Sequence, residues 1–196
     1  DEVQLLYALI KITPISTRPL DRTPLNLALV LDRSTSMKAE RLDAVRQATL
    51  SLVSQMEPED LFSLVVFSDR AEVLIPAQHK PDMRTLRSVL STIRASGGTE
   101  IHRGLIAGLA EATRVRSDRQ INHVILLTDG HTYGDTEKCL GAARAAAQQN
   151  IGISGIGVGS NWNEDFLDHL ASAGGGTVLY SEHPEHIGAA FEHRLR

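Results

Sequence analysis

LNLALVLDRSTSM, residues 25–37, is an apolar run that ends abruptly in a loop of oxygen-bearing side chains. The run from Leu25 to Leu31 is apolar except for Asn26, which indicates a strand that is buried on both faces. Downstream, largely apolar residues recur at steps of three and four, the spacing of an amphipathic helix. They are Leu42, Val45, Thr49, Leu52, Val53 and Met56. A buried strand followed by such a helix is the repeating unit of a parallel sheet.

The same alternation of strands and helices continues to the end of the chain. Further strands are expected at 61–67, 71–75, 123–128, 151–158 and 177–180, and further helices at about 82–93, 101–115, 138–149, 164–173 and 184–195. Pro76 is expected to end the strand over 71–75, and Gly174-Gly175-Gly176 is expected to end the helix over 164–173. We therefore expect an α/β fold, a doubly wound, mostly parallel, Rossmann-like sheet with helices on both faces.

A single α/β domain is expected over residues 24–196. Residues 1–23 are interpreted as a strand over Val3 to Ile12 and a connector, either an edge strand or the remnant of a neighbouring domain. The chain begins at Asp1 rather than at a methionine, which is compatible with a piece of a larger multidomain protein.

Composition excludes several classes of partner. The chain of 196 residues carries a net charge of −4, so it offers no general basic surface for nucleic acid. No apolar run approaches the roughly 18 to 20 residues of a membrane span, so direct membrane insertion is not expected. The single cysteine, Cys139, excludes an intrachain disulfide and is interpreted as a small buried hydrophobe rather than a reactive thiol. Cysteine usage favours a reducing, cytoplasmic compartment, although it does not determine the compartment.

Five oxygen-bearing residues follow the ends of predicted strands or begin a helix. Asp32, Ser34 and Ser36 come directly after the first strand, and Asp129 follows the strand that ends at 128. Thr99 lies in a Gly-Gly-Thr loop before a helix, and its glycines permit close approach of that loop. Because ligands of doubly wound sheets bind beyond the carboxyl ends of the strands, these side chains are expected to meet there.

A hard divalent cation is the natural occupant of such a set. Mg²⁺ prefers oxygen ligands and keeps several waters, and Mn²⁺ and Ca²⁺ are the alternatives. If the hydroxyls bind directly and the carboxylates through water, the metal stays electron-poor and attracts a carboxylate from a partner. Asp-x-Ser-x-Ser alone would also suit a helix N-cap. Its coincidence with the threonine loop and with the second aspartate favours a metal site.

This arrangement resembles the von Willebrand factor A (vWA) domain, whose fold is shared with integrin inserted domains, and its metal-ion-dependent adhesion site (MIDAS). The resemblance covers residues 24–196, and its motifs match residues 31–37, 97–99 and 127–130. It implies that Ser34, Ser36 and Thr99 are direct metal ligands. It also implies that Asp32 and Asp129 bind through water or switch to direct contact.

Two features refine the resemblance. The residue between the two serines is commonly glycine in the family and is Thr35 here, which puts loop shape and ligand access in question. The segment Leu5 to Ile10, followed by Pro24 to Leu27, is more similar to bacterial multidomain members than to extracellular animal ones.

Other polar and glycine-rich positions allow two interpretations each. Glu100, His102, His131 and Tyr133 lie beside the ligand loops, so they are either a rim that selects a partner or solvated loop residues. The histidines of the chain lack the spacing of a zinc site. The glycines of residues 155–159 lack the full dinucleotide-binding spacing, which favours tight packing at a strand end.

Two function classes follow. The first is a metal-dependent protein-binding module, in which an Asp or Glu carboxylate of a partner completes the coordination of the cation. The second is a metal-dependent hydrolase or phosphoryl-transfer enzyme, because a strand-end Asp with Mg²⁺ can serve as a nucleophile. Such an enzyme of the haloacid-dehalogenase type would carry a second carboxylate where Ser34 stands, and the sequence has no P-loop and no evident nucleophile–base pair. We therefore expect a binding module and not an enzyme.

Overall fold

The computed structural model describes residues 22–37, 39–129, 134–159 and 162–181. Its elements in chain order are β1 (Leu25–Asp32), α1 (Ala39–Gln55), β2 (Leu61–Phe67), β3 (Ala71–His79), α2 (Met83–Thr92), α3 (Ile101–Arg114), β4 (Ile121–Thr128), α4 (Thr136–Ala147), β5 (Ile151–Val158), α5 (Glu164–Ala173) and β6 (Gly175–Ser181).

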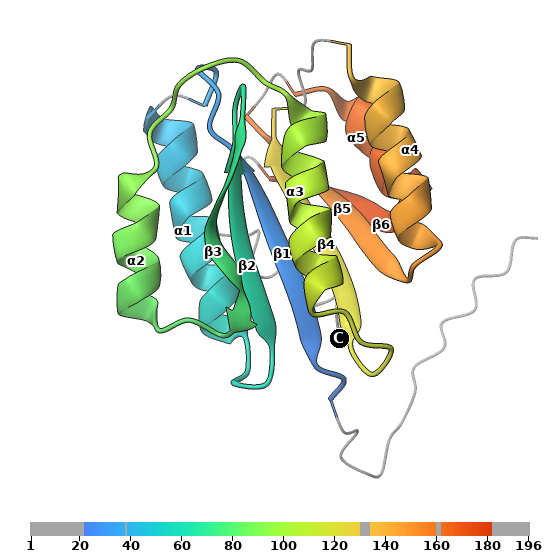
Figure 1. Cartoon of the computed structure of the whole chain (residues 1–196). Helices are drawn as coiled ribbons and strands as arrows, with labels where there is room; N and C mark the ends of the chain where they lie inside the picture. The colour runs from blue at the N-terminus through green and yellow to red at the C-terminus, as the bar shows by residue number, and fades with distance from the viewer. Residues whose placement is uncertain (1–21, 38, 130–133, 160–161, 182–196) are drawn as a thin grey trace, which may run out of the picture.

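The strands form one sheet in the order β3-β2-β1-β4-β5-β6 (Figure 1). All neighbouring strands are parallel except β3, which runs antiparallel to β2. The chain first builds outward from β1 through β2 to β3 and then returns to the other side of β1 with β4. The order therefore reverses between β1 and β4, and the expected doubly wound α/β fold is confirmed.

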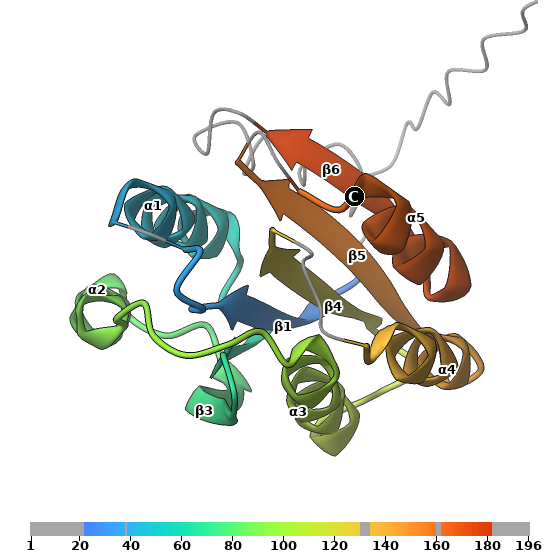
Figure 2. The same ribbon diagram turned by 90° about the horizontal axis from the view of Figure 1, so that it is seen from above.

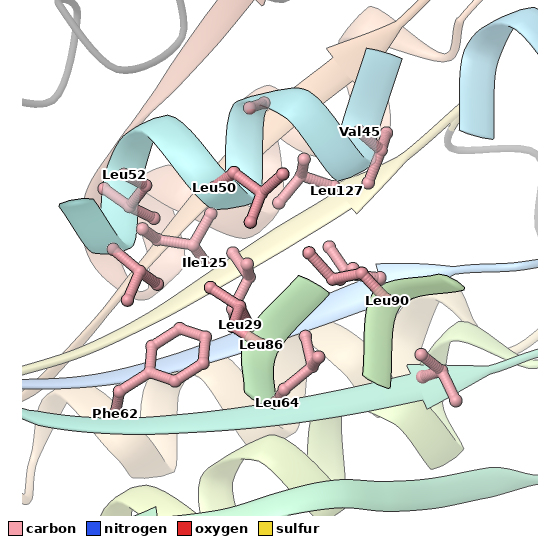
Figure 3. Close-up of a cluster of buried hydrophobic side chains, with 14 of the residues drawn as sticks. Leu29, Val45, Leu50, Leu52, Phe62, Leu64, Leu86, Leu90, Ile125 and Leu127 are labelled. Atoms are coloured by element: carbon pink, nitrogen blue, oxygen red, sulfur yellow. The ribbon is translucent and has the colours of Figure 1, made fainter. Parts of the chain in front are cut away.

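Helices cover both faces of the sheet, with α1 and α2 on one face and α3, α4 and α5 on the other (Figures 1 and 2). Alternate residues of β1 enter two different cores: Leu29 packs on the α1 side, and Val30 packs on the α3 side. In the first core, Leu29 lies near Leu64 of β2 and Ile125 of β4, beneath the side chains of α1 and α2 (Figure 3). Both faces of β1 are covered, which explains its nearly unbroken apolar sequence.

Two predicted boundaries are wrong. Strand β3 continues past Pro76 to His79, because an edge strand tolerates a residue without an amide hydrogen, and the pairing with β2 shifts register beside it. Gly174 ends α5, but Gly175 already begins β6, so the glycine run is part helix cap and part strand. The strand predicted over Val3–Ile12 and the helix predicted over 184–195 lie outside the described residues.

Cys139 agrees with the interpretation from composition. Cys139 is fully buried in α4, and burial raises the pKa of its thiol to about 12. It therefore behaves as a small hydrophobe. Among the described residues, no helix combines the length and the apolar character needed to cross a membrane.

Helix α3 lies unusually close to the sheet. A Cβ atom added to Gly108 would lie 2.3 Å from Cγ2 of Val30, and one added to Gly104 would lie 2.5 Å from the ring of Phe67. These glycines therefore determine how near α3 sits to β1 and β2. Since Thr99 lies just before α3, the same packing determines where that hydroxyl is placed.

We expect Gly108→Ala to lower the free energy of unfolding by about 1–3 kcal/mol, because the added methyl group overpacks the core against Val30. Gly141→Ala in α4 is the matched control, since a Cβ there meets nothing within 4 Å. Loss of a helical glycine at that open position should stabilise the protein by up to about 1 kcal/mol. Urea unfolding of both variants measures the difference, and equal stability of the two would contradict this account of α3.

Candidate metal centre

Oxygen-bearing side chains gather where the strand order reverses. Asp32 is the last residue of β1 and Asp129 directly follows β4, and the two side chains are 0% and 1% exposed. Ser34 and Thr99 are also buried, whereas Ser36 is exposed. The predicted residues thus lie at one edge of the sheet, with the carboxylates deepest.

Hydrogen bonds hold the buried carboxylate of Asp32 in one orientation. Its Oδ1 accepts a hydrogen bond from the backbone N–H of Ser34 at 2.7 Å, and its Oδ2 accepts one from Oγ1 of Thr128 at 2.6 Å. The hydroxyl oxygens of Ser34 and Ser36 lie 2.9 Å apart. Alternate spacing in the loop therefore brings the two hydroxyls together.

The two aspartates repel each other in a region shielded from water. Burial raises the pKa of Asp32 above its ordinary value, and the charge of Asp129 acts in the same direction. Hydrogen bonds from Ser34 and Thr128 oppose this rise. A cation placed between the carboxylates would favour their ionised forms, because an opposite charge at short range offsets both burial and repulsion.

Thr35, the residue that departs from the family pattern, joins two of the loops. Its backbone N–H and its Oγ1 both donate to the carbonyl of Gly97, at 3.1 and 3.0 Å. The amide of Ser96 donates to the carbonyl of Arg33 at 2.8 Å, next to that contact. A glycine at position 35 would lack the hydroxyl bond, so the branched residue fastens the serine loop to the threonine loop.

Asp69, in the turn between β2 and β3, holds the threonine loop from its other side. Its Oδ1 accepts a hydrogen bond from the amide of Gly98 at 2.8 Å. Gly97 has a φ of +81°, and a Cβ there would lie 2.3 Å from Oδ2 of Asp69. The position of Thr99 thus depends on a carboxylate that sequence reasoning missed, because nothing about a lone aspartate in a turn indicates which loop it contacts.

The chemistry of the donor set fits a hard divalent cation. Two carboxylates and three hydroxyls supply oxygen alone, which suits Mg²⁺, Mn²⁺ or Ca²⁺ better than a metal that prefers nitrogen or sulfur. Among the described residues, no group of three or more His, Cys, Asp or Glu side chains could hold a metal ion. The hydroxyls are therefore essential members of any cation site here.

Two of the four predicted rim residues can be placed. Glu100 is exposed at the N-terminal end of α3, and His102 follows in its first turn. The amide of His102 donates to Oδ2 of Asp135 at 2.7 Å, so a residue at the start of α4 caps α3. This contact also escaped sequence analysis, since it joins two different helices. His131 and Tyr133 lie outside the described residues.

Arg41, in the first turn of α1, is a cation beside the site that the sequence did not reveal. Its Nη1 lies 3.6 Å from Oδ2 of Asp129 and donates to the carbonyl of Ser36 at 3.3 Å. The side chain is 33% exposed, so it reaches from the buried carboxylate to the surface. Its position within an ordinary helical sequence gave no sign of this contact.

The glycines near the end of β5 leave room for large side chains to pack on the strand. The ring of Trp162 lies on Gly157, where a Cβ would approach its Cδ2 to 2.3 Å. Leu167 of α5 lies on Gly155, at 3.2 Å from the corresponding position. Large side chains thus occupy the space that glycine leaves, as the packing interpretation predicts.

A serine–histidine pair lies deep in the sheet. Nε2 of His123 and Oγ of Ser154 are 2.9 Å apart, with side chains 8% and 4% exposed. Oγ of Ser154 also accepts the amide of Thr177 at 3.1 Å. Counted along β4, His123 lies about 17 Å from Thr128, the last residue of that strand, which contacts Asp32. Burial lowers the pKa of His123 to about 4, so the pair is neutral and structural.

Comparison with known proteins identifies relatives over most of the chain. The family model of the von Willebrand factor type A domain matches residues 26–192. An uncharacterized protein of Synechocystis sp. is 36% identical over 164 residues, which are 83% of this chain and 39% of that protein. The chain thus spans less than half the length of the curated relatives that it matches.

Solved structures share the fold. The conserved hypothetical protein BatB from Bacteroides thetaiotaomicron has a TM-score of 0.75 at 20% identity, covering 87% of this chain and 96% of its own. Proximal thread matrix protein 1 from the mussel byssus, in a structure with a zinc-occupied MIDAS motif, has a TM-score of 0.70 at 20% identity. That match covers 88% of this chain and 45% of the mussel protein. Identities this low establish the fold alone.

We expect the stability of the protein to fall between pH 6.5 and pH 4 through His123. The folded state holds the pKa of this histidine at about 4 instead of 6.5, so in that window the unfolded chain takes up a proton that the folded state does not. Above pH 6.5 the histidine is neutral in both states and the free energy of unfolding keeps its full value. By pH 4 the free energy of unfolding has fallen by about 3 kcal/mol through this group. Urea unfolding against pH should show a shallower slope for His123→Gln, and parallel profiles would refute the assignment.

Thr35→Val should loosen the threonine loop while keeping side-chain volume, since only the hydroxyl bond to Gly97 is lost. We expect a cost of about 1 kcal/mol in unfolding free energy. Amide exchange at Ser96 and Gly98 should become faster. In the control Thr92→Val, the lost bond is to the carbonyl of Val89 within α2, so these two amides should be unaffected. Unchanged exchange in both variants would show that Thr35 does not hold the loop.

Proposed function

This chain belongs to the von Willebrand factor type A family. From that membership we propose that its acidic edge, the end of the sheet that carries Asp32 and Asp129, is the metal site of a protein-binding module. A divalent cation, Mg²⁺ in the first instance and Mn²⁺ or Ca²⁺ as alternatives, would bind there. An Asp or Glu carboxylate of a partner protein would complete its coordination. We propose that residues 24–196 form this binding domain.

The observation that carries the proposal is a pair of buried carboxylates capped by hydroxyls at the point of strand reversal. Asp32 and Asp129 are almost fully buried and electrostatically coupled, and Ser34 and Ser36 present their hydroxyls 2.9 Å apart. Burying two like charges is costly unless a cation compensates them. A bound divalent ion supplies that compensation.

Each ligand role follows from the contacts of its side chain. Ser34, Ser36 and Thr99 would be direct ligands, because their hydroxyls lie on the loops that close over the carboxylates. Both oxygens of Asp32 already accept hydrogen bonds from the protein, which suits contact with the metal through water. Asp129 would bind in the same way or switch to direct contact. The cation would supply a Lewis-acidic position for the partner's carboxylate.

The mussel byssus protein supports occupancy of this fold by a divalent ion, since its MIDAS motif holds zinc. We propose Mg²⁺ for this chain because the donors are hydroxyl and carboxylate oxygens, which are hard ligands. Glu100 and His102 at the start of α3, together with His131 and Tyr133, would form the rim that selects the partner.

Binding is favoured over hydrolysis by the arrangement of reactive groups. Within the part of the chain that the structure describes, the Ser154–His123 pair is buried and lies far down β4 from the acidic edge. At the acidic edge, both oxygens of Asp32 already accept hydrogen bonds from the protein, from the amide of Ser34 and the hydroxyl of Thr128. Asp32 is therefore better placed to hold a cation than to attack a substrate as a nucleophile.

Calorimetric titration with MgCl₂ and MnCl₂ tests the site. We expect wild-type protein to bind one ion, and Asp32→Ala or Asp129→Ala to weaken binding by at least about tenfold, because each removes a charge next to the cation. Asp118→Ala is the control, since its side chain is 79% exposed and pairs with Arg116. Undiminished affinity in both site variants would rule out the proposed ligands.

Partner capture then separates the two function classes. Immobilised protein loaded with Mg²⁺ should retain partners that chelator-treated protein and the Asp32→Ala variant release. Turnover of p-nitrophenyl phosphate by wild-type protein, abolished in Asp32→Asn, would instead establish the hydrolase alternative.

A further inference from the structure

Arg41 lies between the acidic edge and the solvent. Its Nη1 is 3.6 Å from Oδ2 of Asp129 and donates to the carbonyl of Ser36 at 3.3 Å. One end of the guanidinium thus contacts a residue that we assign to the metal. The side chain is one-third exposed, so part of it is open to solvent beside the site.

The glycine at position 159 leaves room for Arg41. Gly159, just after β5, has a φ of +86°, and a Cβ there would lie 2.7 Å from Nε and 2.8 Å from Cζ of Arg41. The guanidinium therefore occupies space that is open only because residue 159 is glycine. The first turn of a helix also disfavours cations, since the helix dipole is positive at that end. An arginine there needs a compensating role, and its pairing with Asp129 provides one.

Charge balance indicates what that role is. Ionised Asp32 and Asp129 contribute two negative charges, and Arg41 contributes one positive charge, so these three side chains together are negative by one unit. A divalent cation held by them changes their balance to positive by one unit. A single carboxylate then neutralises the group. Without Arg41, the metal and the two aspartates would together be neutral and would have a weaker attraction for an anion.

We propose that Arg41 is the specificity-determining residue of this site. It neutralises Asp129 before the metal binds, and in the metal-loaded state it is the second cation that attracts the partner's carboxylate. The inference rests on the proposed metal site and adds the reason why that site would select a single acidic residue. Arg41 then has opposite effects on two affinities, because it competes with the metal and cooperates with the carboxylate.

Arg41→Gln and Arg41→Lys test this role, with Arg116→Gln as a control at an exposed ion pair with Asp118. The probes are Mn²⁺ alone and, on Mn²⁺-loaded protein, the peptide acetyl-Gly-Asp-Gly-amide beside its Gly-Asn-Gly counterpart. We expect Arg41→Gln to bind Mn²⁺ roughly tenfold more tightly and the acidic peptide several-fold more weakly. Arg41→Lys, which keeps the charge, should stay near wild type in both titrations, and Arg116→Gln should match wild type.

The outcomes distinguish this inference from the metal site itself. A structural role for Arg41 would weaken both affinities in Arg41→Gln, and unchanged affinities would mean no role; either result overturns the inference. Urea unfolding of each variant verifies that the fold is retained. Absence of Mn²⁺ binding by wild-type protein would overturn the metal site together with this inference. Binding that Asp32→Ala abolishes but Arg41→Gln leaves unchanged would overturn only the role of Arg41.

Discussion

Burial of two carboxylates at the ends of neighbouring strands is the constraint on which this molecule is organised, and burial is the largest cause of the raised pKa of Asp32. Asp32 and Asp129 end adjacent parallel strands, so the pairing of β1 with β4 itself brings their charges together. The apolar layers on both faces of β1 give that pairing its rigidity and keep water from screening the charges. The register of β1 against β4 therefore places these two carboxylates at the same end of the sheet.

The loops above the carboxylates are fastened to one another by polar contacts. Thr35 joins the serine loop to Gly97, Asp69 holds the adjacent amide of Gly98, and Asp135 caps the helix that begins after Thr99. Each contact bridges segments that are distant in sequence. Together they place the hydroxyl groups before any ligand arrives, so binding does not have to order the loops.

The fold and the shared location of Asp32, Ser34, Ser36, Thr99 and Asp129 could be predicted because their signals are local. An apolar run such as residues 25–31 indicates by itself that the strand is buried. Oxygen-bearing residues that follow parallel strands are expected at the same end of the sheet. The contacts of Arg41, Asp69 and Asp135 could not be predicted, since each depends on which loop lies opposite. The extension of β3 past Pro76 was missed for a similar reason, because only its edge position makes proline acceptable there.

Helix α3 has a buried face that packs on the sheet and an exposed face that meets solvent. Gly104 and Gly108 occupy the inner face against Phe67 and Val30, while Glu100 begins the helix in an exposed position. Substitutions on the exposed face do not touch the contacts of Gly104 and Gly108, so they should leave the position of the helix on the sheet unchanged. Under the proposed function, substitutions on the exposed face of α3 would change partner recognition while the packing of Gly104 and Gly108 on the sheet stays intact.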